Sequence, residues 1–263
     1  MVICNAEVQE WVEKDGKLVR AICSNGETDE GTLFISDIHP AATCQLVKQS
    51  DRMKHTYRNR IGSLENTFGS FTASLRIKPQ TLRYFNWNQY IYLEPNVWTF
   101  YQENKPVSGL LVSCRVPEDG SEYVQQVDLL TPMTWEKCEA WSHTKVGRRG
   151  DRYKEMKERM AEVCITLAER FIPGLHNMVA ERYTSTPLTY RDYTLTPTGS
   201  AYGLRKDFNN PITTMLSPRT PIPNLLLTGQ NLMLHGLHGV TMTALYTCAQ
   251  VIGKETIKNR IKN

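Results

Sequence analysis

The residues best suited to chemistry lie in the stretch Leu225–Gly253, which reads LLLTGQNLMLHGLHGVTMTALYTCAQVIG. Its apolar start predicts a buried strand, Gly229, Gly236 and Gly239 predict a loop, and the run from Val240 predicts a helix. Glycines allow the backbone to approach a flat or charged ligand, because no Cβ stands in the way. The helix directs its free N–H groups and the positive end of its dipole at the loop. This combination can hold a phosphate or the N1–C2=O edge of a flavin.

The side chains of the same loop add weaker indications. Gln230 and Asn231 can donate and accept hydrogen bonds to ligand hydroxyls. His235 and His238 stand two residues apart with no third ligand nearby, so we expect no metal site. The glycine spacing GxxxxxxGxxG differs from the GxGxxG fingerprint, and taken alone it favours a structural turn over a binding loop.

Composition and charge place the chain among ordinary globular proteins. Of 263 residues, 40% are hydrophobic and 22% charged, and the net charge is +4. Basic and acidic residues are interspersed, so we expect no nucleic-acid partner. The seven cysteines form no CxxC pair, which is typical of free thiols in a reducing compartment, and we expect a cytoplasmic protein, with peripheral membrane contact as a further option.

The remaining pattern predicts a mixed α and β fold. Near the start of the chain, KDGK predicts a turn between two short strands. Strand-like runs such as SFTASLRI, GLLVSCRV and YVQQVDLLT alternate apolar and polar residues, which predicts a largely antiparallel sheet with flanking helices. One amphipathic helix is predicted over 152–171, ended by Pro173 and Gly174. Its predicted core stripe consists of Tyr153, Met156, Met160, Val163, Leu167 and Phe171.

The segment ERYTSTPLTYRDYTLTPTGSAYGL has no clean period, and long irregular segments are often functional. Within it, Tyr190, Arg191 and Tyr193 are candidate substrate-binding residues. A structural turn in which Arg191 and Asp192 form an ion pair is the stronger alternative. The aromatic residues of 84–95 can line an apolar pocket, although an ordinary strand core explains them better. No residue stands out as a catalytic acid or base.

Three stretches, in order, resemble the phytoene desaturase-like flavoproteins, which include carotenoid desaturases, carotenoid isomerases and retinol saturase-like enzymes. The final stretch, NLLLTGQNLMLHGLHGVTMTALYTCAQVIG, resembles the C-terminal FAD signature of this family. The first, ICNAEVQEWVEKDGKLVRAICSNGETDEGTLFISDIHPAAT, resembles its middle part, and STPLTYRDYTLTPTGSAYGL resembles the segment that enters its C-terminal part.

The resemblance implies an FAD-dependent oxidoreductase that transfers hydride to or from a conjugated or isoprenoid-like lipid, with NAD(P) as a further cofactor. It implies elements of a discontinuous, Rossmann-like FAD domain at 1–40 and 222–263 and a substrate-binding domain at 41–221. It also implies cofactor contacts from Val8 through its backbone and from Gly229, Gln230, Asn231, Gly236, Gly239 and Val240. The GxGxxG fingerprint is absent from the chain, so we expect a truncated form whose first FAD-binding half is a separate segment. We therefore expect this chain alone to bind FAD weakly or not at all.

The chain departs from the family pattern at Asn231, where an acid is frequent, and at His235, where a proline precedes the loop glycine. Both departures put fine specificity in doubt. Two other functions stay open: a non-catalytic lipid-binding or interaction domain with vestigial flavin elements, and an amine oxidase-like flavoenzyme. A homodimer that buries exposed apolar surface is also an expectation.

Overall fold

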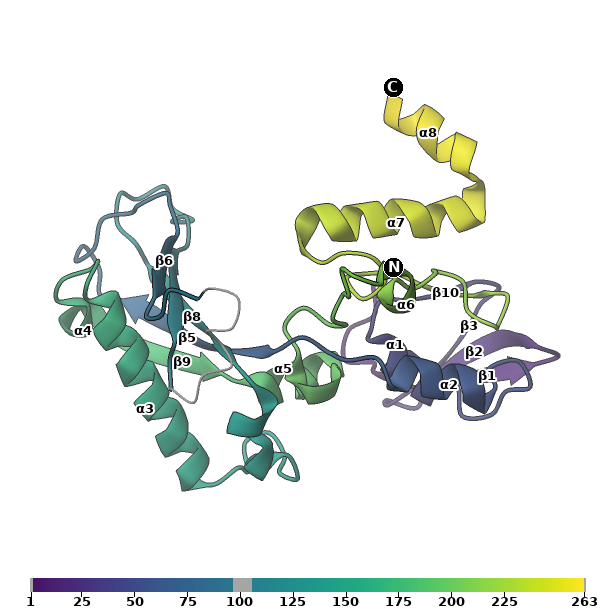
Figure 1. The fold of residues 1–263 in the computed structure, drawn as a ribbon, viewed down its shortest axis with the longest axis horizontal. Coiled ribbons are helices and arrows are strands. Elements are labelled where there is room, and N and C mark those ends of the chain that lie inside the picture. The colour runs from purple at the N-terminus through teal and green to yellow at the C-terminus, as the bar shows by residue number, and fades with distance from the viewer. Residues whose placement is uncertain (1, 97–105, 263) are drawn as a thin grey trace. The chain divides into compact units, whose positions relative to one another are not determined.

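The computed structural model describes residues 2–96 and 106–262 and divides the chain into two compact units, each drawn in Figure 1. Unit 1 consists of Met1–Thr67, Thr194–Pro197 and Tyr202–Asn263, and unit 2 of Phe68–Tyr193 and Thr198–Ala201. Each unit mixes helices and strands, which confirms the predicted fold class. Residues 41–67 and 202–221 belong to unit 1, together with both ends of the chain. From the sequence they were expected in the substrate-binding domain.

Unit 1 contains a three-stranded antiparallel sheet, a two-stranded parallel sheet and several helices. Its elements are β1 (Val8–Lys14), β2 (Lys17–Cys23), β3 (Thr28–Glu30), β4 (Phe34–Ser36), α1 (Pro40–Leu46), α2 (His55–Gly62), α6 (Pro211–Thr214), β10 (Leu225–Leu227), α7 (Gly236–Ile252) and α8 (Lys254–Lys262). Asp15 and Gly16 both have positive φ, at 52° and 76°, in the two-residue turn between β1 and β2. Such turns match the twist of a hairpin, which explains why KDGK predicted one.

The parallel pair β4–β10 joins strands that lie far apart in the sequence. Leu225 pairs with Phe34 and Leu227 with Ser36. All three residues of β10 are buried. Leu225 and Leu227 belong to a core that also includes Trp11 from β1 and Ile61 from α2. A parallel strand pair followed by a loop and a helix is the layout of a Rossmann-like domain.

Unit 2 is built on a five-stranded sheet. Its elements are β5 (Gly69–Ile77), β6 (Gln89–Tyr92), β7 (Gly109–Cys114), β8 (Gln126–Met133), η2 (Trp135–Lys137), η3 (Glu139–Trp141), α3 (Asp151–Ala168), α4 (Leu175–Met178), β9 (Val179–Ser185) and α5 (Pro187–Thr194); η4 (Pro197–Gly199) has residues of both units. The strand order is β6-β7-β8-β5-β9, and all neighbouring strands are antiparallel. The predicted antiparallel sheet is therefore confirmed. Burial alternates strictly along β8, as expected for a sheet with one covered face.

Helix α3 packs against strands β5, β7, β8 and β9 and supplies much of the core of unit 2 (Figure 1). The helix was correctly predicted, but its buried stripe differs from the predicted one. Val163 and Phe171 are 37% and 48% exposed. Small residues close to the sheet take the core positions instead, among them Ala161 and Cys164. The apolar pattern alone could not distinguish the face that contacts the sheet from its flank.

The segment expected to be irregular is largely ordered. Its first part forms β9, which pairs with β5, and residues around the predicted substrate contacts form α5. The expectation of an irregular segment was wrong. Strand β9 is an edge strand with few buried positions, so its Thr and Tyr residues show no alternation of apolar and polar side chains from which a strand could be predicted.

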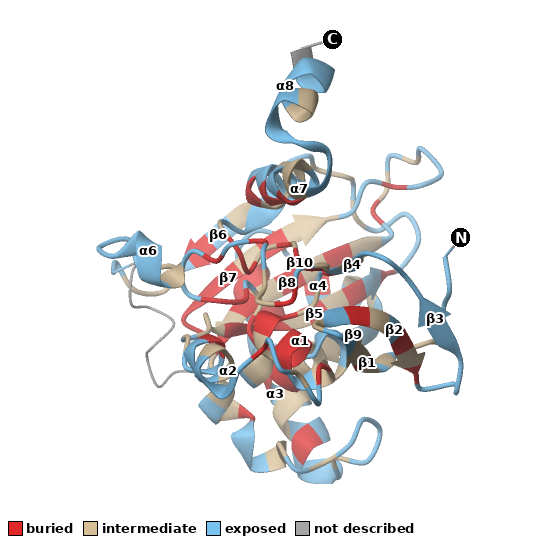
Figure 2. Ribbon diagram, turned by 90° about the vertical axis from the view of Figure 1, so that its right-hand side faces the viewer, coloured by how far each residue is buried: buried red, intermediate tan, exposed pale blue. Residues whose placement is uncertain are grey.

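Helix α7 is largely exposed although its sequence is apolar (Figure 2). Its only buried residues are Gly239, Thr243 and Thr247, which share one face. Thr247 Oγ1 donates to the Leu227 carbonyl at 3.0 Å, which anchors the helix to β10. Among the described residues, no helix has both the length and the apolar composition needed to cross a membrane.

Candidate functional site

The loop that follows β10 begins at Gly229, where the backbone has φ +86°. A Cβ on this residue would collide with the carboxyl group of Asp37, which follows β4. The ends of the two parallel strands therefore meet with almost no space between them. Burial raises the pKa of Asp37. The position after the carboxyl end of parallel strands is where open α/β sheets bind ligands.

Asn231 turns its side chain into the protein. It is 6% exposed, and its Oδ1 accepts a hydrogen bond from the Leu204 amide at 3.1 Å. Gly203, at φ +71°, lies against this side chain, and a Cβ there would overlap Oδ1. The Asn231 side-chain oxygen is thus occupied by a backbone N–H group of the protein. Within the part of the chain that the structure describes, Nδ2 has no hydrogen-bond partner and is the group left for a ligand.

Lys206 binds the backbone of the same loop, a role that the sequence did not predict. Its ammonium donates to the carbonyls of Asn231 at 2.7 Å, Thr214 at 3.0 Å and Leu232 at 3.3 Å. Burial lowers the pKa of Lys206 to about 8. A single lysine after Arg205 in a mixed segment carries no pattern that distinguishes it from a surface lysine.

A second residue missed by sequence reasoning is His39, at the N-cap of α1. Its Nδ1 accepts from the Ala41 amide at 3.2 Å, so Nε2 carries the proton and donates to Asn66 Oδ1 at 2.9 Å. Burial lowers the pKa of His39. The neutral ring fixes the turn that carries Asp37 beside Gly229.

The N-terminus of α7 is open. The helix begins at Gly236, one turn before the predicted start at Val240, which lies in its first turns and is partly buried. The N-cap residue His235 makes no side-chain cap bond, and the first turn carries no acid. A Cβ on Gly236, at φ +77°, would meet no atom within 4 Å. The free N–H groups of this end are therefore not satisfied by a cap.

The other loop residues have distinct surroundings. Gly239 is buried, and a Cβ there would collide with the Leu234 backbone, so this glycine serves close packing. Gln230 is partly buried and makes no side-chain hydrogen bond to the described residues. His235 packs its ring on Tyr202, with centroids 5.0 Å apart. Among the described residues, no group of three His, Cys, Asp or Glu side chains is placed to hold a metal ion.

Val8 begins β1, where it pairs with Cys23 and packs partly buried against the core of unit 1. It belongs to the same unit as the glycine loop and α7. Its predicted backbone contact with the cofactor stays a prediction.

The predicted substrate contacts on α5 belong to unit 2. The Tyr190 hydroxyl accepts from Ser70 Oγ at 2.9 Å. Arg191 bonds Asp192 Oδ1 at 2.8 and 2.9 Å, and its guanidinium lies 5.6 Å from the Trp135 ring centroid. Tyr193, in contrast, is 72% exposed.

Asp192 also pairs with Arg149, whose side chain is only 7% exposed. The sequence indicates the Arg191–Asp192 pair but gives no indication of Arg149. It lies 43 residues away and has no fixed spacing to Asp192. This network gives Arg191 a structural role that it can fill without any ligand.

Comparison with known proteins relates the chain to one kind of enzyme. Human all-trans-retinol 13,14-reductase is 32% identical over 138 residues, which is 51% of this chain and 22% of that protein. The Danio rerio protein of the same name is 32% identical over 121 residues, 45% of this chain and 20% of that protein. This chain is a relative of all-trans-retinol 13,14-reductase. This similarity confirms the resemblance to phytoene desaturase-like oxidoreductases. A comparison with protein-family models found no match.

Solved structures show the same fold. An oxidoreductase from Methanosarcina mazei has a TM-score of 0.52 at 13% identity, covering 91% of this chain and 48% of that one. A putrescine oxidase double mutant redesigned in cofactor binding has a TM-score of 0.54 at 12% identity, covering 98% of this chain and 49% of that one. The chain thus spans about half of these structures and about a fifth of the curated relatives.

Proposed function

We propose that this chain supplies part of the flavin site of an FAD-dependent oxidoreductase that acts by hydride transfer on a conjugated or isoprenoid-like lipid. The observation that carries the proposal is the uncapped N-terminus of α7, which follows a glycine loop at the end of β10. The relationship to all-trans-retinol 13,14-reductase supports the reaction class and an apolar substrate.

The residues present fit a flavin. The open space at Gly236 admits a ligand close to the helix axis, where the free N–H groups and the dipole stabilise negative charge. Gln230 and the Nδ2 group of Asn231 are free to bond ligand hydroxyls. FAD, when bound, would supply the hydride donor or acceptor. Lys206 and Asp37 fix the loop, so that these groups need no rearrangement to bind.

The exposed apolar side chains of α7 support a further part of the proposal. Leu237 is 92% exposed, and Met242, Tyr246 and Val251 are between 43% and 50% exposed. Exposed apolar surface of this kind marks a contact surface. We propose that polypeptide carrying the GxGxxG segment covers it and completes the cofactor site. A second copy of the chain is the alternative occupant.

For the substrate, the proposal rests on Tyr193 among the α5 candidates. Its side chain is exposed, whereas the Tyr190 hydroxyl and the Arg191 guanidinium are held by the protein. An exposed aromatic ring suits an apolar, conjugated ligand. Only the family resemblance supports NAD(P) as a further cofactor.

The test separates binding from folding at Gly236. In the full natural product of the gene, Gly236→Asp places a negative charge at the N-terminus of α7, which stabilises the helix through its dipole. The same charge repels the electron-rich edge of FAD, so we expect FAD affinity to fall about tenfold or more. Any side chain at φ +77° is strained, so thermal stability is compared with that of Gly236→Asn, which has the same strain without the charge, and should be equal or higher in Gly236→Asp. Gly236→Asn is the matched neutral control and should retain most of the affinity. Equal FAD affinity of both variants and the parent would refute the assignment.

A further inference from the structure

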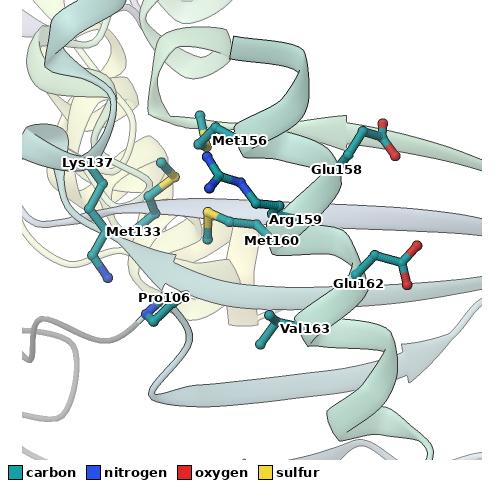
Figure 3. A pocket seen from close by; sticks show the side chains of 9 residues that line it. All are labelled: Pro106, Met133, Lys137, Met156, Glu158, Arg159, Met160, Glu162 and Val163. Carbon is teal, nitrogen blue, oxygen red and sulfur yellow. The ribbon is translucent and has the colours of Figure 1, made fainter. Parts of the chain in front are cut away.

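Unit 2 contains a cavity of about 290 Å³ where the start of α3, strand β9 and helix α5 meet. Its volume lies close to the lower end of the range of about 300–1,000 Å³ over which proteins bind small molecules. Its lining includes the cations Arg149, Lys154 and Lys157, and none of the described residues that line it is an Asp or a Glu. Another cavity of unit 2, shown in Figure 3, is lined by two glutamates as well as two cations. The lining of the smaller cavity thus has charges of one sign, which favours an anionic ligand.

Two of the three cations have acidic partners outside the cavity, but these pairs leave a positive charge. Arg149 pairs with Asp192, and Asp192 also pairs with Arg191, so one carboxylate contacts two guanidinium groups. Lys154 pairs with Asp151 at 3.0 Å, where both side chains are exposed to solvent. These three cations and two acids have one positive charge in excess.

Lys157 adds a second positive charge to the cavity. Within the part of the chain that the structure describes, its ammonium has neither an ion pair nor a hydrogen bond. Glu158, the next residue, is paired elsewhere, because its carboxylate lies 2.8 Å from the Arg182 guanidinium. Figure 3 shows Glu158 and Glu162 extending from the same side of α3, and Glu162 pairs with Arg182 as well. The Lys157 charge is therefore available to a ligand.

Arg149 and Lys157 lie close to the same aromatic ring. The Arg149 Cζ atom is 5.4 Å and the Lys157 Nζ atom 5.3 Å from the centroid of the Tyr153 ring. A hydrogen bond of 2.7 Å between the Tyr153 and Thr186 hydroxyls fixes this ring. Burial lowers the pKa of Lys157, and the Arg149 guanidinium adds to this effect. An anion bound between the two cations would oppose both effects.

Further hydrogen-bond donors surround these cations. The Nε–H group of Arg149 has no acceptor among the described residues, although the side chain is only 7% exposed. The Thr184 hydroxyl makes no hydrogen bond to any described residue either. Thr189 Oγ1 accepts from the Thr186 amide at 3.2 Å, which leaves its own proton to donate. A ligand with several acceptor oxygens would satisfy these donors.

We propose that the substrate of the oxidoreductase carries a phosphate monoester at one end and that this cavity binds the phosphate. A phosphate monoester has a charge of about −1.5 to −2 at pH 7 and three strong acceptor oxygens, which suit these cations and donors. Arg149 and Lys157 hold the phosphate, and the hydroxyls of Thr184 and Thr189 donate to it. The exposed ring of Tyr193, which lines the same cavity, packs on the first carbons of the isoprenoid-like chain. This inference rests on the proposed function, in which Tyr193 contacts the substrate.

The test measures ligand binding to the full natural product of the gene by titration calorimetry at neutral pH. Geranyl phosphate is the probe, geraniol is its uncharged analogue, and inorganic phosphate is the analogue without an apolar chain. We expect saturable binding of geranyl phosphate that is at least about tenfold tighter than binding of either analogue and that weakens with added salt.

Variants assign the binding to this cavity. Lys157→Gln should weaken binding of geranyl phosphate and of inorganic phosphate by about three- to tenfold and leave geraniol binding unchanged. Lys157→Arg should retain most of the affinity. Tyr193→Ala should weaken binding of geranyl phosphate and geraniol and leave that of inorganic phosphate unchanged. Arg159→Gln, on the same helix but at the other cavity (Figure 3), is the matched control and should bind as the parent does.

Several results would overturn the proposal. Absence of saturable geranyl phosphate binding is one, and equal affinity for geraniol is another. Equal affinity for inorganic phosphate would indicate a site for free phosphate instead of a substrate site. An unchanged affinity in the Lys157→Gln, Thr184→Val double variant would also refute it. Because neither flavin content nor hydride transfer enters the measurement, its failure leaves the proposed oxidoreductase function untouched, whereas a native protein without flavin would refute that function and leave the measured binding intact.

Discussion

Replacing Lys206 by methionine tests whether this lysine holds the glycine loop in place. Methionine has a similar length and shape but no donors, so the carbonyls of Asn231, Thr214 and Leu232 lose their partner. A hydrogen bond to a charged group contributes about 1.5–3 kcal/mol net. The two shorter bonds, at 2.7 and 3.0 Å, are therefore worth about 4 kcal/mol together.

Burial of the ammonium offsets part of this contribution. The fall of the Lys206 pKa from 10.5 to about 8 corresponds to about 3 kcal/mol of unfavourable desolvation. The side chain is only partly buried, and screening by solvent reduces this to about 2 kcal/mol. The difference predicts that Lys206→Met lowers the free energy of unfolding by about 2 kcal/mol.

Urea unfolding at neutral pH measures the size of this effect, and hydrogen–deuterium exchange of peptides covering 203–235 shows where it acts. Exchange should accelerate in this segment and remain unchanged in unit 2. Lys258→Met is the matched control, because Lys258 pairs with Glu255 at an exposed site of α8. A change of less than about 0.5 kcal/mol in Lys206→Met, equal to that of the control, would show that Lys206 does not hold the loop in place.

Two further predictions follow from single contacts. Gly229→Ala should destabilise unit 1 by about 2 kcal/mol more than Gly26→Ala in urea unfolding. The two glycines share a φ near +85°, but of the two only Gly229 faces a carboxyl group that a Cβ would overlap. An equal loss of unfolding free energy in both variants would contradict this tight contact. The hydrogen bond to Glu162 raises the pKa of His176 above 6.5, so its contribution to stability is complete below that pH and is lost as the pH rises through the raised pKa. An NMR titration of the ring should show a midpoint above 6.5 that falls in Glu162→Gln, and a midpoint that does not respond to this change would disprove the pairing.

The sequence predicted those features that depend on local pattern. The antiparallel sheet followed from alternation, the hairpin at Asp15 and Gly16 from its turn residues, and α3 from its period. The strand, loop and helix at the end of the chain were also predicted, although α7 begins a full turn before Val240. Gly236 and Gly239 were assigned to the loop, whereas the structure places both in the first turn of the helix, with Gly239 packed closely against the Leu234 backbone.

Features that depend on long-range contacts were not predictable. Lys206 contacts Asn231 across 25 residues, and Arg149 reaches Asp192 across 43 residues. Neither pair has a spacing that a pattern could reveal. Asn231 was expected to bind ligand hydroxyls, yet its oxygen is used by the Leu204 amide. Only the fold shows which polar groups remain free.

If this chain forms part of an FAD site, the native protein that contains it must carry flavin. The native protein would be isolated with antibodies raised against this chain, under non-denaturing conditions. Bound flavin would then be released, identified by mass and quantified against the polypeptide. We expect stoichiometric FAD in a protein that also carries a GxGxxG segment. An intact, folded native protein without any flavin would contradict it.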